Sequence, residues 1–234
     1  MEISDLMEKD MRRWLIALVA IFAAQLSIPV RSEDGPQASA LERAREALAE
    51  RKASEAIALV DPIIAKAEAR DAKDADAMCP GVAAAVLGAF LAKQNSNVVV
   101  SVEDDWCEAM LLKGYALNEL KQPENASAIL GKLVGHDSNN PNYVAEYAYS
   151  LQASGKLDDS KMAYERLKVA SSKLSDKVAR RHWKAVALRG VGYIHSERRE
   201  WEQAVKAYEQ SLKEEPGNKI ALNELDYIAE SRSQ

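Results

Sequence analysis

The stretch LRGVGYIH at residues 188–195 decides the fold of this chain. Gly192 lies within it, Ala204 follows twelve positions later, Tyr208 sixteen positions later, and Pro216 ends the run. Small residues at such a spacing let two antiparallel helices approach closely, while a large residue fills the space toward the adjoining helix. The pattern therefore predicts one helix-turn-helix unit of a protein built by stacking such units.

The same spacing recurs earlier in the chain. Three small residues, three small partners twelve positions later and three large residues four positions further on repeat in register: Gly114, Ala148 and Gly192; Ala126, Ser160 and Ala204; Leu130, Tyr164 and Tyr208. In these positions the chain resembles the tetratricopeptide repeat (TPR) family. The resemblance implies an all-α fold, a right-handed superhelical stack of helix-turn-helix hairpins with a C-terminal capping helix.

The period divides the chain into segments. We expect TPR copies at 107–140, 141–174 and 185–218, and a weaker TPR-like hairpin at 37–70 within an N-terminal helical region, 33–106, whose remainder (71–106) is a helix plus a connector. An insertion at 175–184 has helical spacing and predicts that the first helix of the last copy is extended backward, with Ser175 or Asp176 as its cap. Residues 219–234 are expected to form a capping helix and tail.

The N-terminus carries a different signal. Arg12 and Arg13 precede an apolar run that ends near Pro29, which predicts a secretory signal peptide over residues 1–32. The alternative is an uncleaved anchor over residues 14–30 in the inner membrane, because the run is near the lower length limit for crossing a bilayer. Both Met1 and Met11 stay open as the true start. We expect a periplasmic or secreted protein of a Gram-negative bacterium.

Cys79 and Cys107 are the chain's two cysteines. In an oxidising compartment a pair is more often a disulfide than two idle thiols, so we expect them to be linked. Closing the loop would stabilise the fold by roughly 3 to 4 kcal/mol in the chain-entropy model. The alternative is two small buried hydrophobic residues.

Nothing in the sequence matches a catalytic motif: it has no P-loop, no dinucleotide-binding glycine pattern, no HExxH and no GxSxG. His136, His182 and His195 have no metal-ligand spacing and are interpreted as surface or packing residues. A formal net charge of −5 disfavours a nucleic-acid binder. We therefore expect a protein that is not an enzyme and has no catalytic residues, cofactor or metal.

The family resemblance places one tyrosine per copy toward the concave groove. Tyr115, Tyr149 and Tyr193 directly follow the small residue of each first helix, and polar residues come three positions later: Asn118, Gln152 and Ser196. Tyrosine offers a large apolar face, a hydroxyl group and few rotors to freeze on binding. We expect these six residues to bind a peptide or protein partner. The alternative is that the tyrosines only pack one repeat against the next.

A basic cluster lies at the insertion: Lys177, Arg180, Arg181, Lys184 and Arg189. It is interpreted either as a site for an acidic partner or a membrane surface, or as a solvated helix face. The sequence as a whole predicts a non-catalytic exported scaffold that binds a peptide or protein of unknown identity, in envelope assembly or secretion. The alternatives are a membrane-tethered docking module and an accessory factor that binds a small cell-wall ligand.

Overall fold

The computed structural model describes residues 36–71 and 104–232, and this part of the chain is entirely helical, with nine helices and no strand. The prediction of an all-α fold is confirmed. The helices are α2 (Pro36–Ala49), α3 (Ala53–Asp71), α5 (Asp104–Glu119), α6 (Pro123–His136), α7 (Pro141–Ala153), α8 (Leu157–Ser172), α9 (Lys177–Glu197), α10 (Trp201–Glu214) and α11 (Lys219–Arg232).

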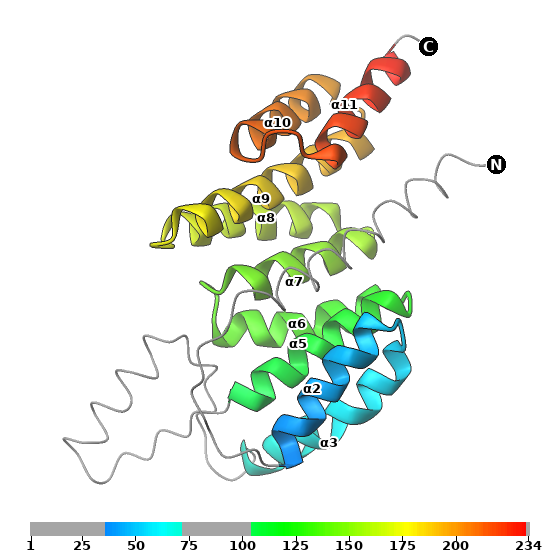
Figure 1. Ribbon diagram of the computed structural model, residues 1–234. Coiled ribbons are helices and arrows are strands. Elements are labelled where there is room, and N and C mark those ends of the chain that lie inside the picture. Colours follow the sequence, from blue (N-terminus) through cyan, green and yellow to red (C-terminus); the bar gives the residue numbers. More distant parts are fainter. Residues whose placement is uncertain (1–35, 72–103, 233–234) are drawn as a thin grey trace.

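Four antiparallel hairpins, α2–α3, α5–α6, α7–α8 and α9–α10, follow one another along the stack, and α11 packs on α10 at its end (Figure 1). The first helices of successive hairpins also touch each other: α2 contacts α5, α5 contacts α7, and α7 contacts α9. No comparable contact joins α6, α8 and α10 in the described chain. The first helices therefore form the inner, tighter side of the stack.

The small residues of the repeat are the sites of close helix approach. A Cβ atom added to Gly114 would lie 2.6 Å from the Leu130 side chain, and one added to Gly192 would lie 3.0 Å from the Tyr208 ring. These are the small and large partners that the period predicts within a hairpin. Ser160 adds a bond to its small partner, since its hydroxyl donates to the Ala148 carbonyl at 2.8 Å.

The next interface uses a glycine two positions earlier. A Cβ atom on Gly190 would lie 2.3 Å from the ring of Tyr164, so the α8 tyrosine packs directly on the α9 backbone. Glycine is required here because any side chain would overlap the ring.

The two helices of each hairpin are joined by the same type of turn. Arg51, Lys121, Gly155 and Arg199 all adopt positive φ, between 56° and 74°. In each turn the next amide bonds to a carbonyl five residues back, at 2.8 to 2.9 Å, and the residue itself bonds three back. This is the Schellman ending, which satisfies carbonyls left over at a helix C-terminus. The α2–α3 hairpin thus ends its first helix in the same way as the three clearer copies.

Helix α9 begins at Lys177, after Asp176, whose carboxylate accepts from the Ala179 amide at 2.6 Å. The expected backward extension with Asp176 as cap is confirmed. None of the described helices is both long and apolar enough to cross a lipid bilayer. The expected signal peptide or anchor, Cys79, and the expected helix and connector up to residue 103 lie outside the described residues.

Candidate functional site

The predicted tyrosines occupy equivalent places on successive first helices. Tyr115 is on α5, Tyr149 on α7 and Tyr193 on α9, and each is half-buried. The structure adds Tyr227 on α11, also half-buried, which follows Tyr193 by the same 34 residues that separate Tyr115 from Tyr149. The period contains this signal, but Asp226 stands where the other copies have a small residue. We name these four residues the tyrosine face.

Tyrosines of this face interact with polar and charged groups of the neighbouring helices. The Tyr115 hydroxyl donates to Asn142 Oδ1 on α7 at 2.9 Å. Burial raises the pKa of Tyr193 well above its ordinary value, with further increases from the charges of Glu197, Glu224 and Tyr149. The hydroxyl groups of Tyr115 and Tyr193 therefore stay protonated, and that of Tyr115 already donates its proton to Asn142.

The three polar residues predicted beside the tyrosines lie between helices instead of at the surface. Asn118, Gln152 and Ser196 are each less than a tenth exposed. Asn118 Nδ2 donates to Ser150 Oγ at 2.9 Å, and Gln152 Oε1 accepts from the Tyr164 hydroxyl at 3.0 Å. Close contact between helices directs these groups to each other, so Asn118 and Gln152 already use bonds that the sequence reasoning assigned to a partner. Their binding role stays a prediction.

A buried carboxylate lies behind the tyrosine face. Glu146 on α7 is 5% exposed, and its Oε2 has no hydrogen-bond partner. Burial raises its pKa to about 8, although a hydrogen bond from Tyr115 opposes the shift. Sequence reasoning missed this residue, because a single Glu within a helix looks like any solvated charge.

Two further carboxylates, on other helices that carry a tyrosine of this face, also have raised pKa values. Burial raises the pKa of Glu119 on α5 and of Glu224 on α11. Glu224 Oε2 accepts from the Tyr208 hydroxyl at 3.1 Å. The tyrosine face is therefore lined by carboxylates that lack strong cationic partners, since only the charge of Arg51 lowers the pKa of one of them, Glu119.

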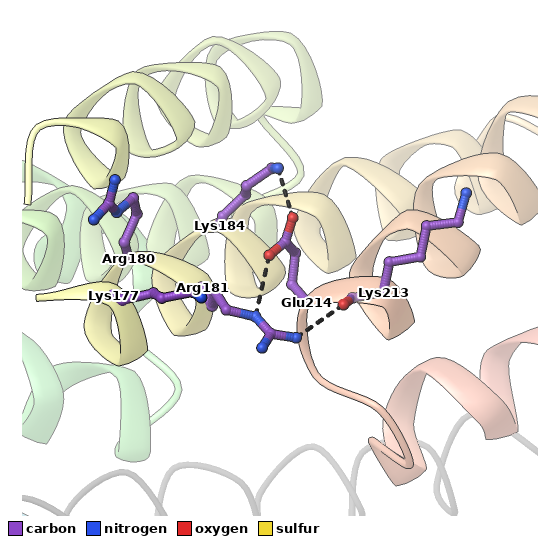
Figure 2. Close-up of a pocket in the computed structure, with 6 residues that line it drawn as sticks. All are labelled: Lys177, Arg180, Arg181, Lys184, Lys213 and Glu214. Atoms are coloured by element: carbon purple, nitrogen blue, oxygen red, sulfur yellow. Dashed lines mark hydrogen bonds and ion pairs between the residues drawn. The ribbon is translucent and has the colours of Figure 1, made fainter.

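The predicted basic cluster forms a hollow at the other end of α9. Four of its five residues line the hollow, which has a volume of about 420 Å³: Lys177, Arg180, Arg181 and Lys184, joined by Lys213 and Glu214 of α10. We name it the cationic hollow. Glu214 lies between two cations, 2.6 Å from Lys184 Nζ and 3.5 Å from Arg181 Nε (Figure 2).

Arg189, the fifth predicted residue, does not line the hollow. It is 7% exposed and donates to Glu215 Oε2 at 2.6 Å, while His182 Nδ1 lies 2.6 Å from the other oxygen of the same carboxylate. Burial alone would raise the pKa of Glu215, but the hydrogen bond of His182 and the charge of Arg189 lower it below its ordinary value. This carboxylate ties the segment after α10 back to α9.

Neither region has the donors of a metal centre. No group of three or more His, Cys, Asp or Glu side chains that could hold a metal ion occurs within 36–71 and 104–232. Cys107, on α5, is 2% exposed. The arrangement of both regions suits contact with another molecule: aromatic rings and hydroxyl groups in one, and a charged recess in the other.

Comparisons with known proteins agree with this fold. No family model and no curated protein matches the sequence. Among solved structures, the chain is similar to the crystal structure of the nearly identical TPR-like repeats of an inferred kinesin light chain from Podosopora anserina. The two share 17% sequence identity with a TM-score of 0.53, over 86% of this chain and 90% of the other. At this identity the likeness shows the fold alone: a stack of TPR-like helical hairpins.

Proposed function

We propose that the protein is a non-catalytic scaffold that binds a peptide or protein along the tyrosine face. The observation that carries the proposal is the row of half-buried tyrosines at equivalent positions on the inner helices α5, α7, α9 and α11. Each tyrosine is partly fixed by its neighbours, so binding would freeze few additional rotors. The TPR-like fold supports a role in protein–protein interaction in general.

The carboxylates beside the tyrosines indicate the partner's chemistry. Glu119, Glu146 and Glu224 all have raised pKa values because of burial. A buried carboxylate is stabilised by any donor or cation that reaches it. We therefore expect a segment rich in hydrogen-bond donors, including Lys or Arg, to bind here in preference to an acidic one.

Site-specific photocrosslinking tests this function. A photoreactive phenylalanine analogue replaces Tyr149 or Tyr193 in one set of variants, and Met162 or Val169, which are exposed on α8, in the matched control set. In cells the tyrosine positions should form a discrete adduct that the α8 positions do not. Tyr115→Ala in the Tyr193 crosslinking variant should weaken that adduct while circular dichroism shows an unchanged fold. Equal adducts from both sets would contradict the proposal.

We also propose that the protein is exported and acts in envelope assembly or secretion, supported by the arginine-led apolar run that ends near residue 30. Mass spectrometry of the protein from cell envelopes tests this. A mature chain that begins at Glu33 supports the soluble periplasmic form. An intact apolar segment would support the membrane-tethered docking module instead.

The cysteine pair belongs to the same proposal. A disulfide between Cys79 and Cys107 requires an oxidising compartment. Thiol labelling of the denatured, unreduced protein should find no free thiol before reduction and two after it. Two labelled sites without reduction would contradict both the disulfide and the oxidising compartment.

A further inference from the structure

We propose that the cationic hollow is a second docking site, which binds an acidic peptide segment of a partner protein. The hollow lies between the N-terminal half of α9 and the end of α10 (Figure 2). It is separate from the tyrosine face: Lys184 and Tyr193 are nine residues apart on α9, two and a half turns, and therefore point to opposite sides of the helix.

The charges of the hollow are not balanced by the residues that the structure describes. Five cations and one carboxylate line it. Glu214 accepts from Lys184 and lies near Arg181, whose Nη2 also donates to the Lys213 carbonyl at 3.0 Å. Lys177, Arg180 and Lys213 form no ion pair with a carboxylate of the described chain, and Arg180 bonds only the Ser175 carbonyl, at 3.3 Å. An anionic ligand would supply the missing negative charge.

The position of these cations opposes helix stability. Lys177, Arg180, Arg181 and Lys184 occupy the first two turns of α9, and the first turn has no acidic residue. Like charges three or four residues apart repel each other, and cations at a helix N-terminus also oppose the helix dipole. Within the fold Arg181 and Lys184 contact α10 through Glu214 and the Lys213 carbonyl. Lys177 and Arg180 form no such ion pair and add repulsion, which an acidic ligand would offset.

Glu214 shows which ligand chemistry the hollow accepts. Its carboxylate is already held by an ammonium and a guanidinium group within the recess (Figure 2). A glutamate or aspartate of a partner would find the same donors on Lys177 and Arg180. The recessed shape favours a narrow peptide over a flat membrane surface, and the net charge of −5 disfavours nucleic acid.

Fluorescence anisotropy with a labelled oligoglutamate peptide at low salt tests the site, with an oligoglutamine peptide as the neutral probe. The full chain should bind oligoglutamate, and Lys177→Ala with Arg180→Ala should weaken binding about ten-fold. Glu214→Gln should tighten binding by about three-fold, because Arg181 and Lys184 lose their internal carboxylate. A merely general electrostatic attraction would not single out this glutamate.

The matched control is the pair Arg43→Ala and Lys66→Ala, which removes the same charges from exposed positions on α2 and α3. It should leave oligoglutamate affinity unchanged. Equal weakening by both pairs, or no effect of Lys177→Ala with Arg180→Ala, would overturn the proposal. Binding to phosphatidylglycerol vesicles without binding to oligoglutamate would overturn it in favour of a membrane surface. Since α9 residues opposite Tyr193 are altered, these results stand independently of partner binding at the tyrosine face.

Discussion

At the tyrosine face and at the cationic end of α9, the pKa values of buried carboxylates are shifted in opposite directions. At the tyrosine face burial raises the pKa of Glu146 to about 8. At the cationic end burial acts in the same direction on Glu215, yet His182 and Arg189 lower its pKa below the ordinary value. The net charge of −5 is thus an average over two regions that differ in their local balance of cations and carboxylates. Of the three carboxylates described at the tyrosine face, only Glu119 is offset by a cation, Arg51. The cationic hollow instead has five cations and one carboxylate, so each region suits a different partner.

The largest expected effect comes from removing the cation that Glu215 depends on. Arg189→Met leaves the carboxylate with His182 and the Asn218 amide as its remaining close partners. Breaking this largely buried ion pair should lower the free energy of unfolding by about 3 kcal/mol at neutral pH. Urea denaturation followed by circular dichroism measures the loss. Arg189→Met combined with Glu215→Gln is the control and should recover part of it. A single variant as stable as the wild type would show that the cations do not hold this carboxylate.

The pH dependence of stability should have opposite signs in the two regions. The pKa of Glu146 is raised from 4.5 to about 8, so its contribution is fully present below the ordinary pKa and is lost as pH rises toward 8. Because Gln stays neutral, Glu146→Gln should exceed the wild type in stability by about 2 kcal/mol at pH 8 and match it at pH 5. The pKa of Glu215 is lowered, so its contribution is present above the ordinary value and is lost as pH falls.

Chemical denaturation across this pH range separates the two carboxylates. Glu215→Gln is the comparison, and it should lose most of its deficit relative to the wild type as pH falls below 4.5. If Glu146→Gln had the same pH profile of stability as Glu215→Gln, the opposite pKa shifts inferred for the two regions would be contradicted.

The repeat period predicted the hairpins and three tyrosines, because close helix approach requires small residues at fixed positions. It did not predict the ion pairs, since Arg189 and Glu215 are 26 residues apart and only folding brings them together. For the same reason Asn118 looked available in sequence, although its amide bonds Ser150. Tyr227 shows the converse, because the 34-residue spacing contained it and only the unmatched Asp226 concealed it. The repeat period of the sequence predicts which residues pack between helices, whereas the partners of polar groups depend on tertiary structure.

A smaller effect should come from the hydroxyl that joins α5 to α7. Tyr115→Phe removes the bond to Asn142 but keeps the ring, so stability should fall by about 1 kcal/mol. Tyr227→Phe is the matched control at the equivalent position, and its hydroxyl has no hydrogen-bond partner among the described residues. Thermal unfolding of both variants measures the difference. Equal losses would show that the tyrosines of this face contribute through their rings alone.

The smallest expected effect tests whether the cationic hollow contributes to the stability of the fold. Lys177 is exposed and forms no ion pair with a carboxylate of the described chain. Lys177→Ala should therefore change stability by less than about 0.5 kcal/mol, toward greater stability because repulsion from Arg180 and Arg181 is relieved. Differential scanning calorimetry of this variant beside Lys66→Ala measures the change. A loss comparable to that of Arg189→Met would mean that the cations of the hollow hold the helices together. If stability is unchanged while oligoglutamate binding weakens, Lys177 serves a ligand, because the stability of the described helices then does not depend on it.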